Sequence, residues 1–196
     1  MTGLIILAAG ASSRLGEPKQ NLVYRQKTLL QNAMHAGISS GCNPVIIVLG
    51  ANADMILPHI KGTEGISIAI NPEWQEGIAS SIRTGVTKIG KEERVNDAII
   101  MLCDQPFVNS ELLLQMQQAK QQTDKAIVAC HYAGTPGVPV LFDKTMFAGL
   151  LKLHGNEGAK TILKDHEGDM AIIAFDKGSI DIDTKDDYNK LLDANN

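Results

Sequence analysis

Seven short runs of apolar, mostly β-branched residues recur along the chain and are separated mostly by segments with helical periodicity. The runs lie at residues 4–7, 45–49, 66–70, 98–102, 126–129, 138–142 and 171–175, and helices are expected at 28–40, 52–61, 77–89, 109–122, 143–153, 157–166 and 185–193. This alternation predicts a three-layer α/β/α sheet. The early runs are continuously apolar, which indicates parallel strands buried on both faces. Asn109 and Thr184 are expected to cap two of the helices.

The length and charge of the chain limit the functions that it can serve. Its 196 residues fit a single domain spanning 1–196, large enough to bury about 70% of its unfolded surface. The net charge of −4 gives no general attraction to nucleic acid or anionic membrane, and 4% aromatic content disfavours a base-stacking platform. We therefore expect no nucleic-acid or membrane partner. A small anionic ligand would have to be held by local basic residues such as Arg14, Lys19, Arg25 and Lys27.

The N-terminus and the cysteines favour a cytoplasmic protein with reduced thiols. The first residues lack a charged leader and a cleavage site, and the longest apolar stretch is far shorter than the roughly 18 residues of a membrane span. Cys42, Cys103 and Cys130 are widely spaced and form no C-x-x-C pair, which disfavours a disulfide framework or a zinc site. None of the histidines falls in a metal-ligand motif, so they receive no role.

A small, basic, glycine-containing loop follows the first apolar run at residues 7–19. Gly10 and Gly16 remove side chains where a backbone must approach phosphate oxygens, and successive N–H groups in such a turn form a concave anion site. Arg14 and Lys19 add positive charge. Pro18 restricts the residue before it to extended geometry and is expected to hold Lys19 on a fixed turn. The loop is therefore interpreted as a binding site for a nucleoside triphosphate, with an ordinary glycine turn as the alternative.

Two common phosphate-binding loops are absent from this segment. The dinucleotide fingerprint needs G-x-G-x-x-G, whereas the loop has no glycine between Gly10 and Gly16. The P-loop needs four residues between its glycines and then Lys-Ser or Lys-Thr, whereas Glu17 and Pro18 follow here. The segment therefore represents a different kind of phosphate site.

Carboxylates follow two later strands at the same predicted edge of the sheet. Asp104 follows the run at 98–102 and precedes a proline turn, so its side chain is expected in the crevice at the carboxyl ends of the strands. Facing a triphosphate loop, it is a candidate ligand for Mg²⁺, although it could instead cap the helix near Asn109. Asp181 and Asp183 lie two apart on an extended segment and share a face. They form either a D-x-D metal site or a solvated strand end.

Six segments resemble, in the same order, those of the MobA-like nucleotidyltransferases. They are LAAGASSRLGEPKQ at 7–20, NPEWQEGIASSIRTG at 71–85, CDQP at 103–106, GVPVLF at 137–142, GNEGAK at 155–160 and DIDTKDDY at 181–188. The resemblance spans essentially the whole chain and is strongest to the molybdenum cofactor cytidylyltransferases, the MocA type. It implies a Rossmann-like nucleotidyltransferase domain with a mostly parallel mixed sheet.

The resemblance implies transfer of CMP from CTP to the terminal phosphate of molybdenum-bound molybdopterin, with Mg²⁺ as cofactor and pyrophosphate as product. A recipient molybdenum hydroxylase or its chaperone is a further implied partner. Arg14, Lys19 and Asp104 would be catalytic, and Asp104 would bind metal with Asp181 or Asp183. The implied nucleotide-binding residues are Leu7, Ala8, Ala9, Gly10, Arg14, Lys19, Gly77, Ser81 and Asp104, and Asn71 would lie over the cleft.

The expectation that CTP is the donor rests on Ala9. In the family that the chain resembles, an alanine at this position accompanies cytidylyl transfer and a glycine accompanies guanylyl transfer. An alanine methyl narrows a pocket that a glycine would leave open for a purine, and one methyl group changes the discrimination between two substrates by about 1–3 kcal/mol. The chain departs from the family at Asn156 and Lys160, where an aspartate and an arginine are usual. If these positions contact the acceptor, the acceptor of this protein differs from the usual one. The alternatives are another nucleotide donor or phosphate acceptor, a non-catalytic molybdenum cofactor carrier, and a glycosyltransferase that uses Asp181 and Asp183.

Overall fold

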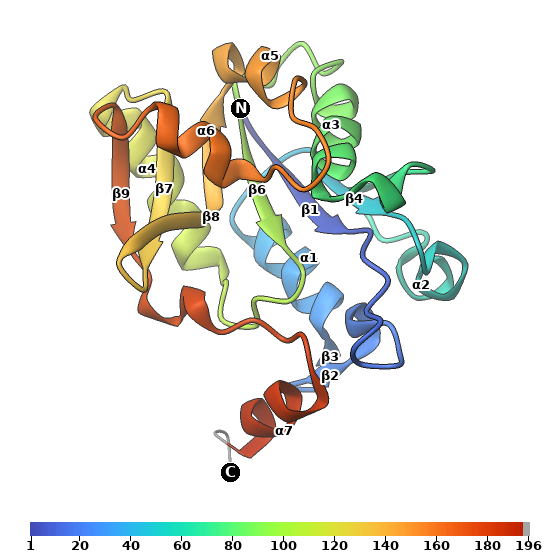
Figure 1. Cartoon of the computed structure of the whole chain (residues 1–196). Helices are drawn as coiled ribbons and strands as arrows, with labels where there is room; N and C mark the ends of the chain where they lie inside the picture. The colour runs from blue at the N-terminus through green and yellow to red at the C-terminus, as the bar shows by residue number, and fades with distance from the viewer. Residues whose placement is uncertain (194–196) are drawn as a thin grey trace.

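A seven-stranded mixed sheet forms the middle layer of the protein, whose computed structural model describes residues 1–193 (Figure 1). In spatial order its strands are β5 (Ile66–Ile70), β4 (Val45–Leu49), β1 (Thr2–Ala8), β6 (Asp97–Leu102), β8 (Thr135–Asp143), β7 (Ile127–Tyr132) and β9 (Met170–Ala174). Strand β1 pairs in parallel with both β4 and β6, whereas β8 runs antiparallel to both of its neighbours. The mostly parallel mixed sheet predicted from the sequence is therefore confirmed.

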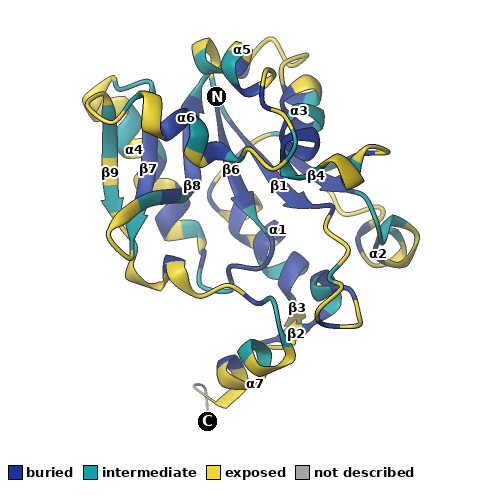
Figure 2. Ribbon diagram, in the orientation of Figure 1, coloured by how far each residue is buried: buried dark blue, intermediate teal, exposed yellow. Residues whose placement is uncertain are grey.

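Helices cover both faces of this sheet, as Figure 1 shows. One face packs against α1 (Leu29–Ser39), α2 (Ala53–Ile60) and α4 (Ser110–Thr123), and the other against α3 (Ile78–Ile89), α5 (Phe147–Leu150) and α6 (Ala159–Asp165). Alternate residues of β1 enter the two cores, with Leu4 and Ile6 on one side and Ile5 and Leu7 on the other. Each such burial contributes about 1.5–3 kcal/mol. The central strands are accordingly buried along most of their length (Figure 2).

A third, smaller apolar cluster lies under the loop that follows β1. It joins that loop to the short hairpin of β2 (Val23–Tyr24) and β3 (Lys27–Thr28) and to the C-terminal helix α7 (Lys185–Asp193). Its buried members are Leu15, Leu22, Tyr24, Leu29, Ile182 and Leu191. The cluster thus fixes the phosphate loop against a segment near the end of the chain.

The strands and helices expected from the sequence are all present, with shifted ends. The segment expected as one helix at 143–153 is instead a 3₁₀ helix η3 (Lys144–Met146) followed by the short α5, because Asp143 caps a tight turn by accepting from Thr145 N at 2.9 Å. Asn109 caps α4 and Thr184 caps α7, as predicted. The sequence did not predict the β2–β3 hairpin or the 3₁₀ helices η1 (Lys19–Asn21), η2 (Trp74–Glu76) and η4 (Asp176–Ser179).

Two expectations about the environment of the chain can be compared with this fold. Cys42, Cys103 and Cys130 are buried and free, as core thiols are. Within residues 1–193, no helix combines the length and the apolar character that a membrane crossing requires.

Candidate active site

A cleft of about 390 Å³ opens where β1 and β6 end at the same edge of the sheet. Parallel strands place their ligand sites at their carboxyl ends, and here the loops that follow both strands form the cleft. It is lined by all but one of the residues that sequence analysis assigned to the nucleotide, namely Leu7, Ala8, Ala9, Gly10, Lys19, Gly77, Ser81 and Asp104. Arg14 is the exception and stands outside the lining, with 67% of its side chain exposed.

The loop after β1 is held in shape by polar contacts to its own backbone. Gln20 is fully buried, and its amide Nε2 donates to the carbonyl oxygens of Ala8 at 2.7 Å and Gly10 at 3.3 Å. The N–H of Lys19 donates to Ser12 Oγ at 3.0 Å, which fixes the start of η1 just after Pro18. The fixed turn expected at Lys19 is present. Gln20 ends the family-like segment at 7–20 but received no role from the sequence, because residue type alone does not show that a glutamine binds backbone carbonyls.

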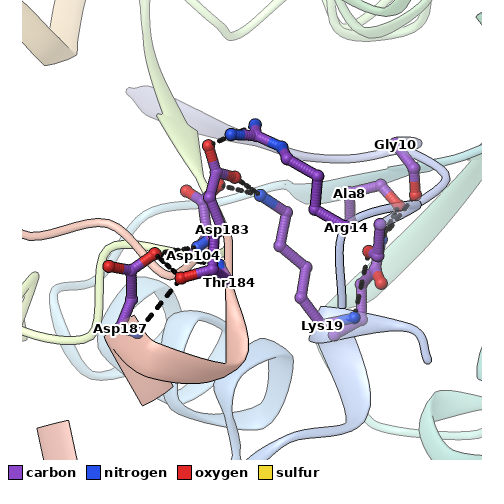
Figure 3. A network of polar contacts seen from close by, with 10 residues as sticks. Ala8, Gly10, Arg14, Lys19, Asp104, Asp183, Thr184 and Asp187 are labelled. Carbon is purple, nitrogen blue, oxygen red and sulfur yellow. Dashed lines mark hydrogen bonds and ion pairs between the residues drawn. The ribbon is translucent and has the colours of Figure 1, made fainter. Parts of the chain in front are cut away.

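The charged groups of the cleft meet at one ammonium (Figure 3). Lys19 Nζ donates to Asp104 Oδ2 at 2.5 Å and to Asp183 Oδ1 at 2.7 Å, and Arg14 Nη2 donates to Asp183 Oδ2 at 2.7 Å. These groups come from the loop after β1, the end of β6 and the segment before α7. Sequence analysis grouped them correctly, although residues 181–183 form an irregular segment and not part of a strand.

Burial and neighbouring charge shift the acid–base properties of this group in defined directions. Burial raises the pKa of Asp104, and the ammonium of Lys19 opposes that rise. Burial tends to lower the pKa of Lys19, but the Asp104 carboxylate outweighs it and raises the pKa above its usual value. The hydrogen bond from Lys19 lowers the pKa of Asp183. Lys19 therefore carries a full positive charge at neutral pH.

The donor set of this group suits a hard divalent cation. Asp104 Oδ1 is buried and has no hydrogen-bond partner, and Asp181 and Asp183 lie near enough to raise the pKa of Asp104. Within residues 1–193 there is no cluster of three or more acidic, histidine or cysteine side chains placed to enclose a metal ion. Mg²⁺ commonly takes one or two carboxylates and fills its other positions with water and phosphate oxygens. Asp104 and Asp183 fit that pattern. Asp181 is exposed, and Ile182, which lies between Asp181 and Asp183, is buried.

The wall opposite the loop begins at α3. Asn71 is buried and donates through Nδ2 to Ser80 Oγ at 2.8 Å and Ser81 Oγ at 3.0 Å, which ties the end of β5 to the first turn of α3. Gly77 is the N-cap of α3. The positive dipole end at such a position favours a negatively charged ligand. Ser81 and Gly77 line the cleft, whereas Asn71, which was expected to lie over it, is not part of the lining and holds Ser81 from behind.

A second cavity of about 330 Å³ adjoins the cleft and shares Leu7, Ile78 and Leu102 with it. Its lining is mostly apolar, with Asn156 and Lys160 among its polar members. These are the two positions at which the chain departs from the usual family pattern. The arrangement offers one site for a nucleotide and a neighbouring site for a second, partly apolar molecule.

The lining of the cleft also differs from the sequence-based expectation at other residues. Arg25 and Lys27 lie on the β2–β3 hairpin and do not line the cleft, so they are not its basic residues. Trp74 and Cys103 line it without having been singled out. Burial and the nearby Asp104 raise the pKa of Cys103 to about 12, so its thiol stays protonated and is a poor nucleophile at neutral pH.

Comparisons with known proteins agree with this geometry. A family model described as a MobA-like NTP transferase domain matches residues 4–170. The chain is 27% identical to nicotine blue oxidoreductase from Paenarthrobacter nicotinovorans, covering 96% of this chain and 95% of that protein. It is 26% identical to molybdenum cofactor cytidylyltransferase from Escherichia coli strain K12, covering 94% of this chain and 92% of that protein.

A solved structure of high similarity is Rv0371c from Mycobacterium tuberculosis H37Rv, with a TM-score of 0.84, 30% identity, and coverage of 98% of this chain and 97% of that one. A structure of Rv0371c in complex with manganese has a TM-score of 0.78 at 27% identity, covering 98% of each chain. The family model covers most of the chain, including Lys19 and Asp104 of the cleft. The chain belongs to the MobA-like NTP transferase family.

Proposed function

We propose that the protein transfers CMP from CTP to the terminal phosphate of molybdenum-bound molybdopterin in the cytoplasm, releasing pyrophosphate, with Mg²⁺ as cofactor. One observation carries the proposal: Lys19 and Asp104 form an ion pair in a cleft lined by Ala8, Ala9 and Gly10. The relationship to molybdenum cofactor cytidylyltransferase supports the choice of acceptor.

The roles of the charged residues follow from their positions. Lys19 in the cleft and Arg14 at its mouth would hold the phosphates of the nucleotide and stabilise the departing pyrophosphate. Asp104 and Asp183 would hold Mg²⁺, which when bound neutralises charge on the transferring phosphates. The acceptor phosphate is already ionised and needs little help from a general base. Consistent with this, the described linings of the two cavities contain no histidine.

Ala9 supports cytosine over a purine. It is buried to 6% exposure in the wall of the cleft, and its methyl group reduces the space that a glycine would leave there. Gly50, after β4, lies against both Ala9 and Trp74, and a Cβ at Gly50 would stand 2.9 Å from the Ala9 methyl and 2.7 Å from Trp74 Cβ. The Ala9 methyl is thus backed by packed structure and cannot easily retreat from a larger base.

The second cavity supports an acceptor with an apolar body. Leu7, Ile78 and Leu102 form the boundary that it shares with the nucleotide cleft, so an acceptor bound there lies next to the donor. The flat faces of a pterin ring can pack against an apolar wall while its polar edge meets Asn156 or Lys160, whereas a polyol presents hydroxyl groups in all directions and would lose more hydrogen bonds to water. The product of such a transfer would then pass to a recipient molybdenum hydroxylase or its chaperone.

The test is pyrophosphate release with Mg²⁺ and molybdenum cofactor, using CTP, GTP, ATP and UTP in parallel. Release with CTP alone would support the proposal, and release with another nucleotide would keep the reaction and reassign the base. Turnover only with a different phosphate acceptor would replace the substrate. Binding of CTP without turnover on any acceptor would favour a carrier role.

The control for this test is Asp104→Asn, which keeps the size of the side chain and removes its charge. We expect turnover to fall about 10²–10³-fold, because the carboxylate that would hold the metal is gone. Asp169→Asn is the matched variant, since Asp169 forms an exposed ion pair with Lys125 away from the cleft. Its turnover should equal that of the wild type. Near-normal turnover by Asp104→Asn would contradict the assignment of this site.

A further inference from the structure

The nucleotide cleft and the second cavity are walled by two segments that touch at Gly77. The segment at 74–77 lines the cleft, and the segment at 156–161 lines the second cavity. In Figure 1 the orange stretch that leads into α6 lies beside the green start of α3, and Ala79 N donates to Gly155 O at 3.1 Å. Gly77 has φ +126°, and a Cβ there would collide with the carbonyl oxygen of Gly155 and with Asn156 Oδ1. The two walls are therefore in close contact at this point.

A single guanidinium ties these two walls together. Arg83, on α3, donates from Nη1 to Glu76 Oε1 at 2.8 Å and from Nη2 to Glu76 Oε2 at 2.5 Å. The same Nη1 donates to the carbonyl oxygen of Leu153 at 2.7 Å. Glu76 Oε1 also accepts from Gly155 N at 3.1 Å. The Arg83–Glu76 pair thus binds the backbone of the 153–155 segment through both a carbonyl and an N–H group.

The charge and shape of the pair suit a positioning role. The hydrogen bonds from Arg83, followed by that from the Gly155 backbone, lower the pKa of Glu76 to about 2, so both partners are ionised at neutral pH. A guanidinium presents its donors in a planar fork, which meets both carboxylate oxygens and a third acceptor at once. A lysine ammonium in its place would provide charge without that fork. Neither cavity is lined by Arg83, so it can act on bound substrates only through the groups that it holds.

We propose that Arg83, acting through Glu76, is a positioning residue that fixes the distance between the bound nucleotide and the acceptor. The inference rests on the proposed function, since it assigns the nucleotide to the cleft and the acceptor to the second cavity. In-line attack requires the reacting atoms to approach within about 3–3.5 Å, and a displacement of about 1 Å can cost about 10²-fold in rate. Releasing the 153–155 segment from α3 allows a displacement of that kind.

The kinetic test compares Arg83→Met, Arg83→Lys and wild-type protein. Methionine keeps the apolar stem and removes the fork, and we expect its dissociation constant for CTP with Mg²⁺ to stay within about threefold of wild type while kcat falls on the order of 10²-fold. The KM for the acceptor should rise in parallel. Lysine should recover only a small part of the loss. Lys125→Met, which removes the exposed ion pair to Asp169, is the matched control and should behave as wild type.

A second measurement does not depend on knowing the acceptor. Amide hydrogen exchange, followed with and without CTP and Mg²⁺, reports on the segments at 72–79 and 152–158. In the wild type we expect the nucleotide to protect both segments, because the Arg83–Glu76 pair transmits the ordering of one wall to the other. In Arg83→Met it should protect 72–79 and leave 152–158 unchanged.

The two measurements separate failure of this inference from failure of the proposed function. If the wild type transfers CMP to no acceptor, the proposed function fails, and hydrogen exchange alone decides the role of Arg83. The inference is overturned if nucleotide protects 152–158 equally in Arg83→Met and wild type. It is also overturned if the folded variant keeps wild-type kcat and acceptor KM and loses only thermal stability.

Discussion

Lys19 Nζ lies 2.5 Å from Asp104 Oδ2, so the ammonium stands against the carboxylate that is proposed to hold a metal ion. The same ammonium reaches Asp183 at 2.7 Å and thereby supplies the counter-charge of both acidic side chains. Only 15% of the Lys19 side chain and 10% of the Asp104 side chain are exposed, so solvent screens this pair weakly. Lys19 and a divalent cation therefore compete for the charge of the same two carboxylates, those of Asp104 and Asp183.

This competition predicts the metal affinity of Lys19→Met. Without the ammonium, Asp104 loses its counter-charge and Asp183 keeps only that of Arg14, so a divalent cation at the same place gains several kcal/mol of attraction at an effective dielectric of about 20. We expect Mn²⁺, measured by electron paramagnetic resonance without nucleotide, to bind about tenfold tighter or more. Affinity for CTP should fall, since Lys19 no longer contacts its phosphates. Lys27→Met on the hairpin is the control, and equal Mn²⁺ affinity in all three proteins would refute the competition.

Gln20→Leu tests the residue that fixes the phosphate loop. Leucine has a similar size but leaves the carbonyl oxygens of Ala8 and Gly10 without their side-chain donor. Losing a buried partner costs about 1–3 kcal/mol, so we expect the free energy of unfolding in urea to fall by about that amount. The dissociation constant for CTP should rise as well, because the loop is less ordered. Gln121→Leu on α4, an exposed position, provides the comparison and should change neither quantity.

Ala9→Gly tests the size argument for the base. Removing one methyl group from the wall of the cleft should shift the ratio of kcat/KM for CTP over GTP toward GTP. The shift should be about 10–200-fold, the range that one methyl group in a pocket provides. Parallel kinetics with both nucleotides on both proteins would measure it. An unchanged ratio would mean that residues elsewhere in the cleft choose the base.

Glu76→Gln tests the pH dependence that the Arg83 contact implies. The pKa of Glu76 is lowered to about 2 in the folded protein, against about 4.3 in an unfolded chain. A carboxylate with a lowered pKa stabilises the fold fully above the unfolded value and loses that contribution as pH falls toward the folded value. We therefore expect the wild type to exceed Glu76→Gln in Tm at pH 6 and the difference to shrink between pH 4.5 and pH 2. Thermal unfolding by circular dichroism measures it, and a constant difference would argue against the ion pair.

Much of the fold could be predicted because it depends on local patterns. The run at 45–49 is apolar at every position, and β4 is buried at every position because helices cover both faces of the sheet. The β2–β3 hairpin escaped prediction because its strands are two residues each, too short for any periodicity to show. The helix expected at 143–153 is shorter because Asp143 and Thr145 form a competing turn.

The sequence singled out those residues of the cleft whose residue type indicates a charged or phosphate-binding role. Lys19 and Asp104 are charged residues close to a proline, Asp183 belongs to the Asp181–Asp183 pair, and the topology brings all three together. Gln20 and Arg83 were not identified, because their importance depends on backbone groups that approach them only in the folded chain. Arg83, for example, binds the carbonyl of Leu153, which is 70 residues away.

The ion pair between Arg14 and Asp183 joins positions 169 residues apart, and the apolar cluster beneath it includes Leu15 and Ile182. A ribosome that has made the loop after β1 must therefore continue past residue 183 before that loop receives its second carboxylate and part of its apolar support. The growing polypeptide can assemble the proposed metal site only after residues 181–183 have left the ribosome.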